Sequence, residues 1–165
     1  MKAYSVLHER TTMDKNTLPT QENSEFWIRA ENESMKYSES TKRCGKWMIF
    51  IHVSEIDDTW IKIRKAIEDE KLGRRAKVAT MKENRNAVRK EYKVICVYTY
   101  DSDDREDVVR VLKALREIGI RDKMYYKEDE ATVSGQYSFN SGGKSVSKYW
   151  VDVDEIILRI PKNRR

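Results

Sequence analysis

Basic side chains are concentrated in the middle of the chain, and their types suit phosphate binding. The densest positive stretch is broken only by Glu83 and Glu91. Its members are Lys71, Arg74, Arg75, Lys82, Arg85, Arg89 and Lys90. Ammonium groups and forked guanidinium groups bind phosphate oxygens when they lie close together. The stretch therefore indicates either a phosphate-binding surface or an ordinary solvated face, which is what charge runs usually form.

Two aromatic residues, Trp27 and Tyr37, lie in polar, irregular sequence where a core position is less secure. Aromatic rings in such sequence stack on a base or pack against the edge of a sheet. Beside basic residues they indicate a ligand-binding surface. The candidate ligand-binding residues are Trp27, Tyr37, Arg43, Lys46, Lys82, Arg85 and Arg89.

Residues for nucleophilic or metal chemistry are scarce in this chain. With only His8 and His52 available, and with Cys44 and Cys96 lacking metal-ligand spacing, no Ser/His/Asp triad or zinc site can be assembled. The segment at 140–145, NSGGKS, has incomplete phosphate-loop spacing, and a hairpin turn explains its glycines better. We therefore expect no metal and no cofactor.

Hydrophobic patterns predict the elements that position these residues. Nearly continuous apolar runs at 46–53 and 92–100 are typical of central strands. Ser54, and later Asp101 or Ser102, are expected to cap two acid-headed amphipathic helices, with Gly73 as the left-handed residue that closes the first. The expected helices span 54–72 and 103–118, with a short one at 23–30, and the expected strands span 46–53, 76–81, 92–100, 123–127, 133–139, 146–153 and 156–160.

These elements predict an α+β fold with a curved, mainly antiparallel β-sheet of about six to eight strands. Both main helices are expected on the convex face of the sheet. The expected core residues are Trp47, Ile49, Ile51, Ile56, Trp60, Ile63, Ile67, Val94, Cys96, Val108, Leu112 and Leu115.

Composition predicts one densely charged domain. The chain has 165 residues, with 33 Lys and Arg against 28 Asp and Glu, and a formal net charge of +5. We expect a flexible N-terminal arm at 1–22, a single domain at 23–160 and a basic tail at 161–165. No stretch is apolar enough for a membrane span or a secretion signal, so a membrane protein is excluded and a cytoplasmic location is expected.

Four segments, at 42–51, 56–60, 95–100 and 105–108, carry a resemblance to the cap-binding translation initiation factor 4E family. That family has a basic-Gly-basic-Trp strand start, a Trp-bearing helix, a strand and an Arg-Glu-headed helix in this order. A closer match, which extends to YYK at 125–127 and GQYS at 135–138, resembles the family of the basophilic leukaemia-expressed protein. This resemblance implies an initiation-factor-4E-like fold and no established activity.

The residues of the cap pocket are not reproduced. The position that corresponds to the second stacking Trp of the cap-binding factors is Lys36, and the position of the Glu that reads guanine is Tyr37. The resemblance therefore implies a binding fold without the methylated-cap site. Our leading hypothesis is a binding module for a nucleotide or short RNA-like ligand on the concave face of the sheet.

A third pattern, Gly45–Trp47 with Leu72–Gly73 and Ala76–Val78, resembles the bacterial phosphothreonine lyase effectors. The resemblance implies that Lys77 is the base that removes the α-proton and that Lys46 holds the phosphate. The family's general-acid His is replaced by Met48, and a thioether cannot donate that proton. The alternative hypothesis is thus a lyase-like enzyme, or a degenerate relative of one, acting on phosphothreonine or phosphoserine in a phosphoprotein.

Overall fold

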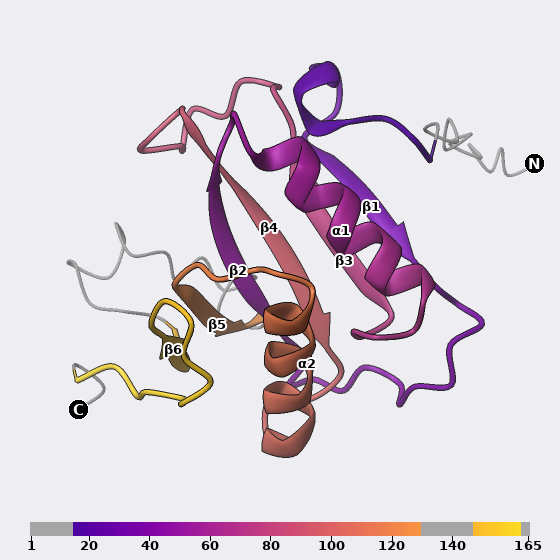
Figure 1. Cartoon of the computed structure of the whole chain (residues 1–165), viewed down its shortest axis with the longest axis vertical. Coiled ribbons are helices and arrows are strands. Elements are labelled where there is room, and N and C mark those ends of the chain that lie inside the picture. Colours follow the sequence, from indigo (N-terminus) through magenta and orange to yellow (C-terminus); the bar gives the residue numbers. More distant parts are fainter. Residues whose placement is uncertain (1–14, 130–146, 163–165) are drawn as a thin grey trace, which may run out of the picture.

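The computed structural model describes residues 15–129 and 147–162. Its sheet has six strands in the order β1-β3-β4-β2-β5-β6, and every neighbouring pair is antiparallel (Figure 1). Residues Pro19–Gln21 form a short 3-10 helix, η1. The strands are β1 (Trp27–Glu31), β2 (Gly45–His52), β3 (Arg75–Ala79), β4 (Tyr92–Thr99), β5 (Met124–Glu128) and β6 (Tyr149–Val151).

Both α-helices cover the same face of the curved sheet, as Figure 1 shows. Helix α1 spans Ile56–Glu68 and helix α2 spans Arg105–Glu117. Their apolar residues recur on one side and are buried, including Trp60 in α1 and Leu112 in α2. The expected α+β fold, with two helices on the convex side of an antiparallel sheet, is therefore confirmed.

The helix starts differ from the predicted caps. Helix α1 begins at Ile56 with Glu55 as its N-cap residue, which makes no side-chain cap hydrogen bond. The Ser54 hydroxyl is instead hydrogen-bonded to Nδ1 of His52 at 2.8 Å. Helix α2 is capped by Asp104, whose carboxylate accepts from the Asp107 amide at 3.1 Å. The expected caps Asp101 and Ser102 were placed too early because the acidic run allowed several starts.

Gly73 is needed for space rather than for a left-handed backbone. The left-handed residue after α1 is Glu70, with φ of 60°. A Cβ at Gly73 would lie 2.2 Å from the backbone oxygen of Tyr98, so only glycine fits. The predicted C-terminal role of Gly73 was therefore wrong, although the position does require glycine.

The short helix predicted at 23–30 is wrong, because residues 27–31 form the edge strand β1. Its alternation puts Ile28 and Ala30 into the core and leaves Trp27 on the other face. Pairing with β3 supplies the backbone hydrogen bonds of this segment. Tertiary pairing thus overrides a local pattern that also suits a helix turn.

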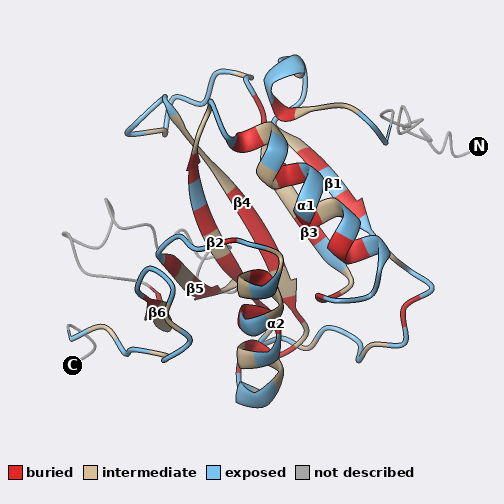
Figure 2. Cartoon of the chain, in the orientation of Figure 1, coloured by how far each residue is buried: buried red, intermediate tan, exposed pale blue. Residues whose placement is uncertain are grey.

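The core lies between the two helices and the sheet, where Figure 2 shows a buried stripe on each helix. Ten of the expected core residues belong to this cluster, including the fully buried Trp47 and Trp60. Two do not. Val94 is half-buried, and Cys96, although buried, belongs to the opposite face of the sheet.

Of the expected late strands, the one at 156–160 differs from the structure, and the one at 133–139 lies outside the described residues. Of the segment at 156–160, only Arg159 makes a β-bridge, to Trp150.

Among the described residues, no helix is long and apolar enough to cross a membrane.

Candidate functional site

Side chains of opposite character line the two faces of the sheet. Trp47, Ile49 and Ile51 of β2 point to the helices, so Lys46 and Met48 point to the other face, which we call the helix-free face. Antiparallel partners share a face, and this rule defines two rows that cross the strands. The first row is Glu31, Arg75, Tyr98, Lys46 and Lys127, and the second is Arg29, Lys77, Cys96, Met48 and Tyr125.

The first row holds a tyrosine between two cations. The Arg75 guanidinium lies over the Tyr98 ring at 5.3 Å from its centroid, and Nζ of Lys46 lies 5.6 Å from the same centroid. Burial raises the pKa of the Tyr98 hydroxyl, which stays neutral and can donate a hydrogen bond. The arrangement offers a polarised ring with positive charge on each side.

Lysines on this face are desolvated. Burial, with a smaller contribution from Lys46, lowers the pKa of Lys77. Lys127 is 4% exposed, and burial followed by repulsion from Lys46 lowers its pKa as well. Two lysines with lowered pKa around a third cation form a place where an anion would be stabilised.

Carboxylates are fewer than cations on the same face. Asp129, which follows β5, accepts from Nζ of Lys46 at 2.8 Å. Glu31 is the cross-strand partner of Arg75. The two rows and Asp129 therefore combine five cationic residues with two carboxylates.

Trp27 lies one row beyond Arg29 on this face, at the edge of the sheet. Nζ of Lys77 lies 3.9 Å from the centroid of its ring. The structure thus brings Trp27 against Lys77 and puts both on the same face as Lys46.

Three other predicted residues lie in the connection between β3 and β4, past the Trp27 end of the sheet. Lys82 lies over the Phe26 ring at 4.3 Å from the centroid, and Arg89 pairs with Glu91 at 3.0 Å. Arg85 is exposed in the same connection. They are separated along the strands from Lys46, which lies near the other end of the face.

The remaining two predicted residues lie at the Lys46 end and hold structural partners. The Tyr37 hydroxyl donates to Asp107 of α2 and accepts from the Tyr100 amide. Arg43 forms ion pairs with Asp101 at 2.9 Å and with Asp103 at 3.0 Å. Their side chains bridge the 32–44 loop to the start of α2, away from Trp27.

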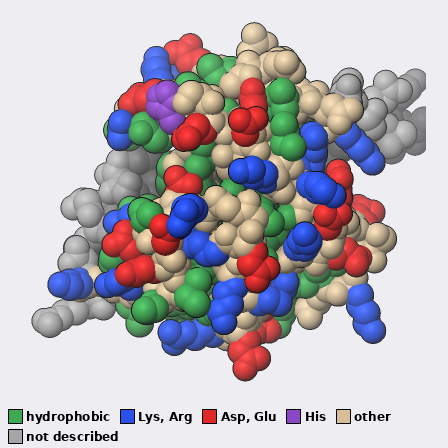
Figure 3. All heavy atoms as spheres, viewed as in Figure 1, with side chains coloured by type: hydrophobic (Ala, Val, Ile, Leu, Met, Phe, Trp, Pro, Cys, Tyr) green, Lys and Arg blue, Asp and Glu red, His purple; other side chains and the backbone are tan. Residues whose placement is uncertain are grey.

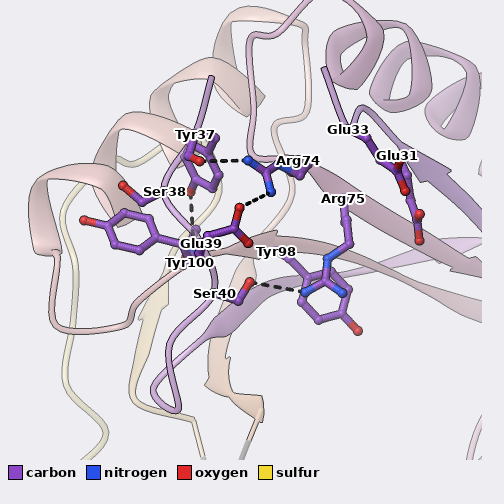
Figure 4. Close-up of a pocket in the computed structure, with 11 residues that line it drawn as sticks. Glu31, Glu33, Tyr37, Ser38, Glu39, Ser40, Arg74, Arg75, Tyr98 and Tyr100 are labelled. Atoms are coloured by element: carbon purple, nitrogen blue, oxygen red, sulfur yellow. Dashed lines mark hydrogen bonds and ion pairs between the residues drawn. The ribbon is translucent and has the colours of Figure 1, made fainter. Parts of the chain in front are cut away.

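A cavity of about 630 Å³ opens next to the first row, under the loop that carries Tyr37 (Figure 4). Arg74 crosses it, donating to Glu39 at 3.1 Å and to the Tyr37 carbonyl at 2.8 Å. Arg75 reaches Ser40 at 3.4 Å, so its fork makes only one long hydrogen bond here. The lining is Glu31, Glu33, Tyr37, Ser38, Glu39, Ser40, Arg74, Arg75, Tyr98, Thr99 and Tyr100. The cavity therefore extends the helix-free face at its Lys46 end.

The helix side has a different charge pattern. Figure 3, which views that side, shows Lys and Arg interspersed with Asp and Glu. The difference in charge between the two sides makes the helix-free face the candidate site.

Within residues 15–129 and 147–162, no group of three or more His, Cys, Asp or Glu could hold a metal ion.

Sequence reasoning missed Arg29, Tyr98, Lys127 and Asp129. Strand alternation alone puts Tyr98 and Cys96 on the same side as each other, but only the register across β2, β3 and β4 aligns them with Lys46 and Lys77. Arg29 was missed because its segment was predicted to be helical. Asp129 carried no local signal, since it follows a strand end.

Solved structures similar to part of this chain include eIF4E proteins. An Ascaris suum eIF4E-3 in complex with an m2,2,7G cap matches with a TM-score of 0.47 and 17% identity over 62% of this chain and 61% of that one. A schistosome eIF4E complexed with m7GpppA and 4E-BP matches with a TM-score of 0.44 and 14% identity, over 56% and 51%. The match thus spans about half to three fifths of those factors and assigns no ligand to this chain.

The family comparison covers far more of the sequence. The model of the basophilic leukemia-expressed protein Bles03 matches residues 7–133, which include strands β1 to β5, both α-helices and every residue of the two rows. The chain belongs to the Bles03 family.

Proposed function

We propose that the chain is a binding module whose helix-free face holds a nucleotide or a short RNA-like ligand through its phosphate groups. The observation that carries the proposal is the pair of adjacent rows with five cationic residues. Arg75 and Lys77 present a fork and a point charge on one strand, which suits phosphate oxygens. Trp27, at the end of the same face, is the ring we expect to stack on a base.

The dimensions of the rows favour a ligand with more than one phosphate. Arg29 and Lys46 lie on β1 and β2, which are separated by β3 and β4. Three strand spacings correspond to about 14 Å. A single phosphate cannot contact both ends, whereas a dinucleotide or a short single strand can.

We expect Lys77→Gln and Arg75→Gln each to weaken nucleotide binding by about tenfold, because each removes one charge-assisted hydrogen bond to phosphate. Isothermal titration calorimetry at low salt, with mono-, di- and cyclic nucleotides, cap analogues and short oligonucleotides, measures the effect. Lys113→Gln is the matched control, because it removes the same charge from an exposed position of α2 on the other side of the sheet. No binding by the wild type to any of these probes would refute the proposal, and so would equal weakening by the control.

One observation supports the second candidate function, a lyase-like reaction. Lys77 faces Cys96 directly across β3 and β4, and Cys96 faces Met48 across β4 and β2, so base and acid positions share a row. A neutral Lys77 would take the α-proton of phosphothreonine, the electron pair would form the Cα–Cβ double bond, and phosphate would leave with the Cβ–O bond. The lowered pKa of Lys77 favours the neutral amine that this step needs.

The two functions predict opposite pH dependence. Binding needs the ammonium form of Lys77, so affinity falls as pH rises through its lowered pKa. Elimination needs the neutral amine, so the rate rises over the same range.

Mass spectrometry of phosphothreonine peptides measures the loss of phosphoric acid directly. We expect turnover to be inefficient, because loss of the acid costs about 10²- to 10⁴-fold; lyase activity that rises with pH and is abolished in Lys77→Ala would overturn the binding module.

A further inference from the structure

Lys46 and Asp129 form an ion pair of unequal partners. The Lys46 side chain is 5% exposed, whereas the Asp129 side chain is 35% exposed. The ammonium is therefore fixed inside the helix-free face, and the carboxylate reaches it from the rim. The exposed partner is the one that can leave.

The backbone of Asp129 stays in place when its side chain turns. Its amide donates to the carbonyl of Cys44 at 2.9 Å, which anchors the residue beside the start of β2. A rotation about the side-chain bonds alone would carry the carboxylate from Lys46 toward solvent. The exchange thus needs no rearrangement of the sheet.

The charge of Asp129 acts on the whole centre of the face. It raises the pKa of Lys77 and of Lys127, against the larger effect of burial in each case. It also adds to the raised pKa of the Tyr98 hydroxyl, again after burial. A carboxylate in this position does for the lysines what a bound phosphate would do.

We propose that Asp129 is an internal competitor for an anion subsite on Lys46, and that a phosphate group of the ligand binds there when the carboxylate swings out. The inference rests on the proposed function, since it concerns the same face. It adds a subsite for a phosphate or sulfate group and the residue that controls access to it. Affinity at this subsite is set by the difference between two anions on one ammonium group, not by Lys46 alone.

The test compares Asp129→Asn with the wild type in titrations of inorganic phosphate and tripolyphosphate at low salt, followed by calorimetry. Asparagine keeps the shape of the side chain and removes its charge. We expect the variant to bind both anions about five- to tenfold more tightly. Asp58→Asn, an equal charge change at an exposed position in the first turn of α1, should leave the affinity unchanged.

The remaining variants and outcomes distinguish the competitor role of Asp129 from the proposed function. Adding Lys46→Met to Asp129→Asn should abolish the gain, and circular dichroism with cooperative thermal unfolding establishes that the variants are folded. If the wild type binds the anions and Asp129→Asn binds no more tightly, the competitor role is wrong and the proposed function stands. An equal gain in Asp58→Asn would also overturn it, as a general charge effect. If no protein binds any anion, both proposals fall.

Discussion

Replacing Trp60 by alanine should lower the free energy of unfolding by about 3 to 5 kcal/mol, the range for deleting a large buried aromatic side chain. Trp60 is fully buried in α1 and belongs to the single core between helices and sheet. Two effects contribute to the loss. The variant no longer gains the free energy of transferring the indole from water to the core, and alanine leaves a cavity in its place. Urea unfolding followed by circular dichroism measures the loss.

Trp47 provides a matched comparison. Its Nε1 donates to the carbonyl of Val108 at 3.0 Å, whereas Nε1 of Trp60 is buried without a hydrogen-bond partner among the described residues. Replacement by phenylalanine removes the same atoms at both positions. Trp47→Phe should therefore cost about 1 kcal/mol more than Trp60→Phe, the net contribution of a hydrogen bond.

Unchanged stability of Trp60→Ala would mean that α1 does not pack on the sheet as described.

The parts of the fold that sequence predicts well are those in which one physical signal dominates. The runs in β2 and β4 are apolar on the core face and long enough to be central strands, and both helices repeat apolar residues on one face. β1 was predicted wrongly because five residues with one tryptophan and one isoleucine carry no decisive period. Its state is set by β3, which lies nearly fifty residues later in the chain.

The site is less predictable for a related reason. Lys46 and Lys77 were identified through a resemblance, and Trp27 through its unusual surroundings. The cation rows, however, exist only in the register of several strands, and Asp129 reaches Lys46 across 83 residues of sequence. Lys82, Arg85 and Arg89 belong to the densest run of positive charge, yet they lie in one connection at the far end of the face. Local charge density therefore points to a stretch of chain, while the density in space is set by pairing.

Binding of a short single-stranded RNA should weaken by roughly 20- to 50-fold between about 50 mM and 200 mM salt, if three to four cations of the rows contact phosphates. Each contact releases a condensed counterion, so log K falls with log salt with a slope of about −0.7 for each phosphate neutralised on a single strand. Fluorescence anisotropy of a labelled ten-nucleotide RNA across a potassium chloride series measures the slope.

The slope also reports which residues touch phosphate. Lys77→Gln combined with Arg75→Gln should reduce its magnitude by about 1.4, which corresponds to two lost contacts. Lys113→Gln combined with Lys62→Gln removes two exposed lysines from the helices and should leave it unchanged. A slope near zero in the wild type would mean that the cations of the rows do not contact phosphates. A loss of slope in the helix variant would instead place the phosphate contacts on the helix side of the sheet, where the two signs of charge are interspersed.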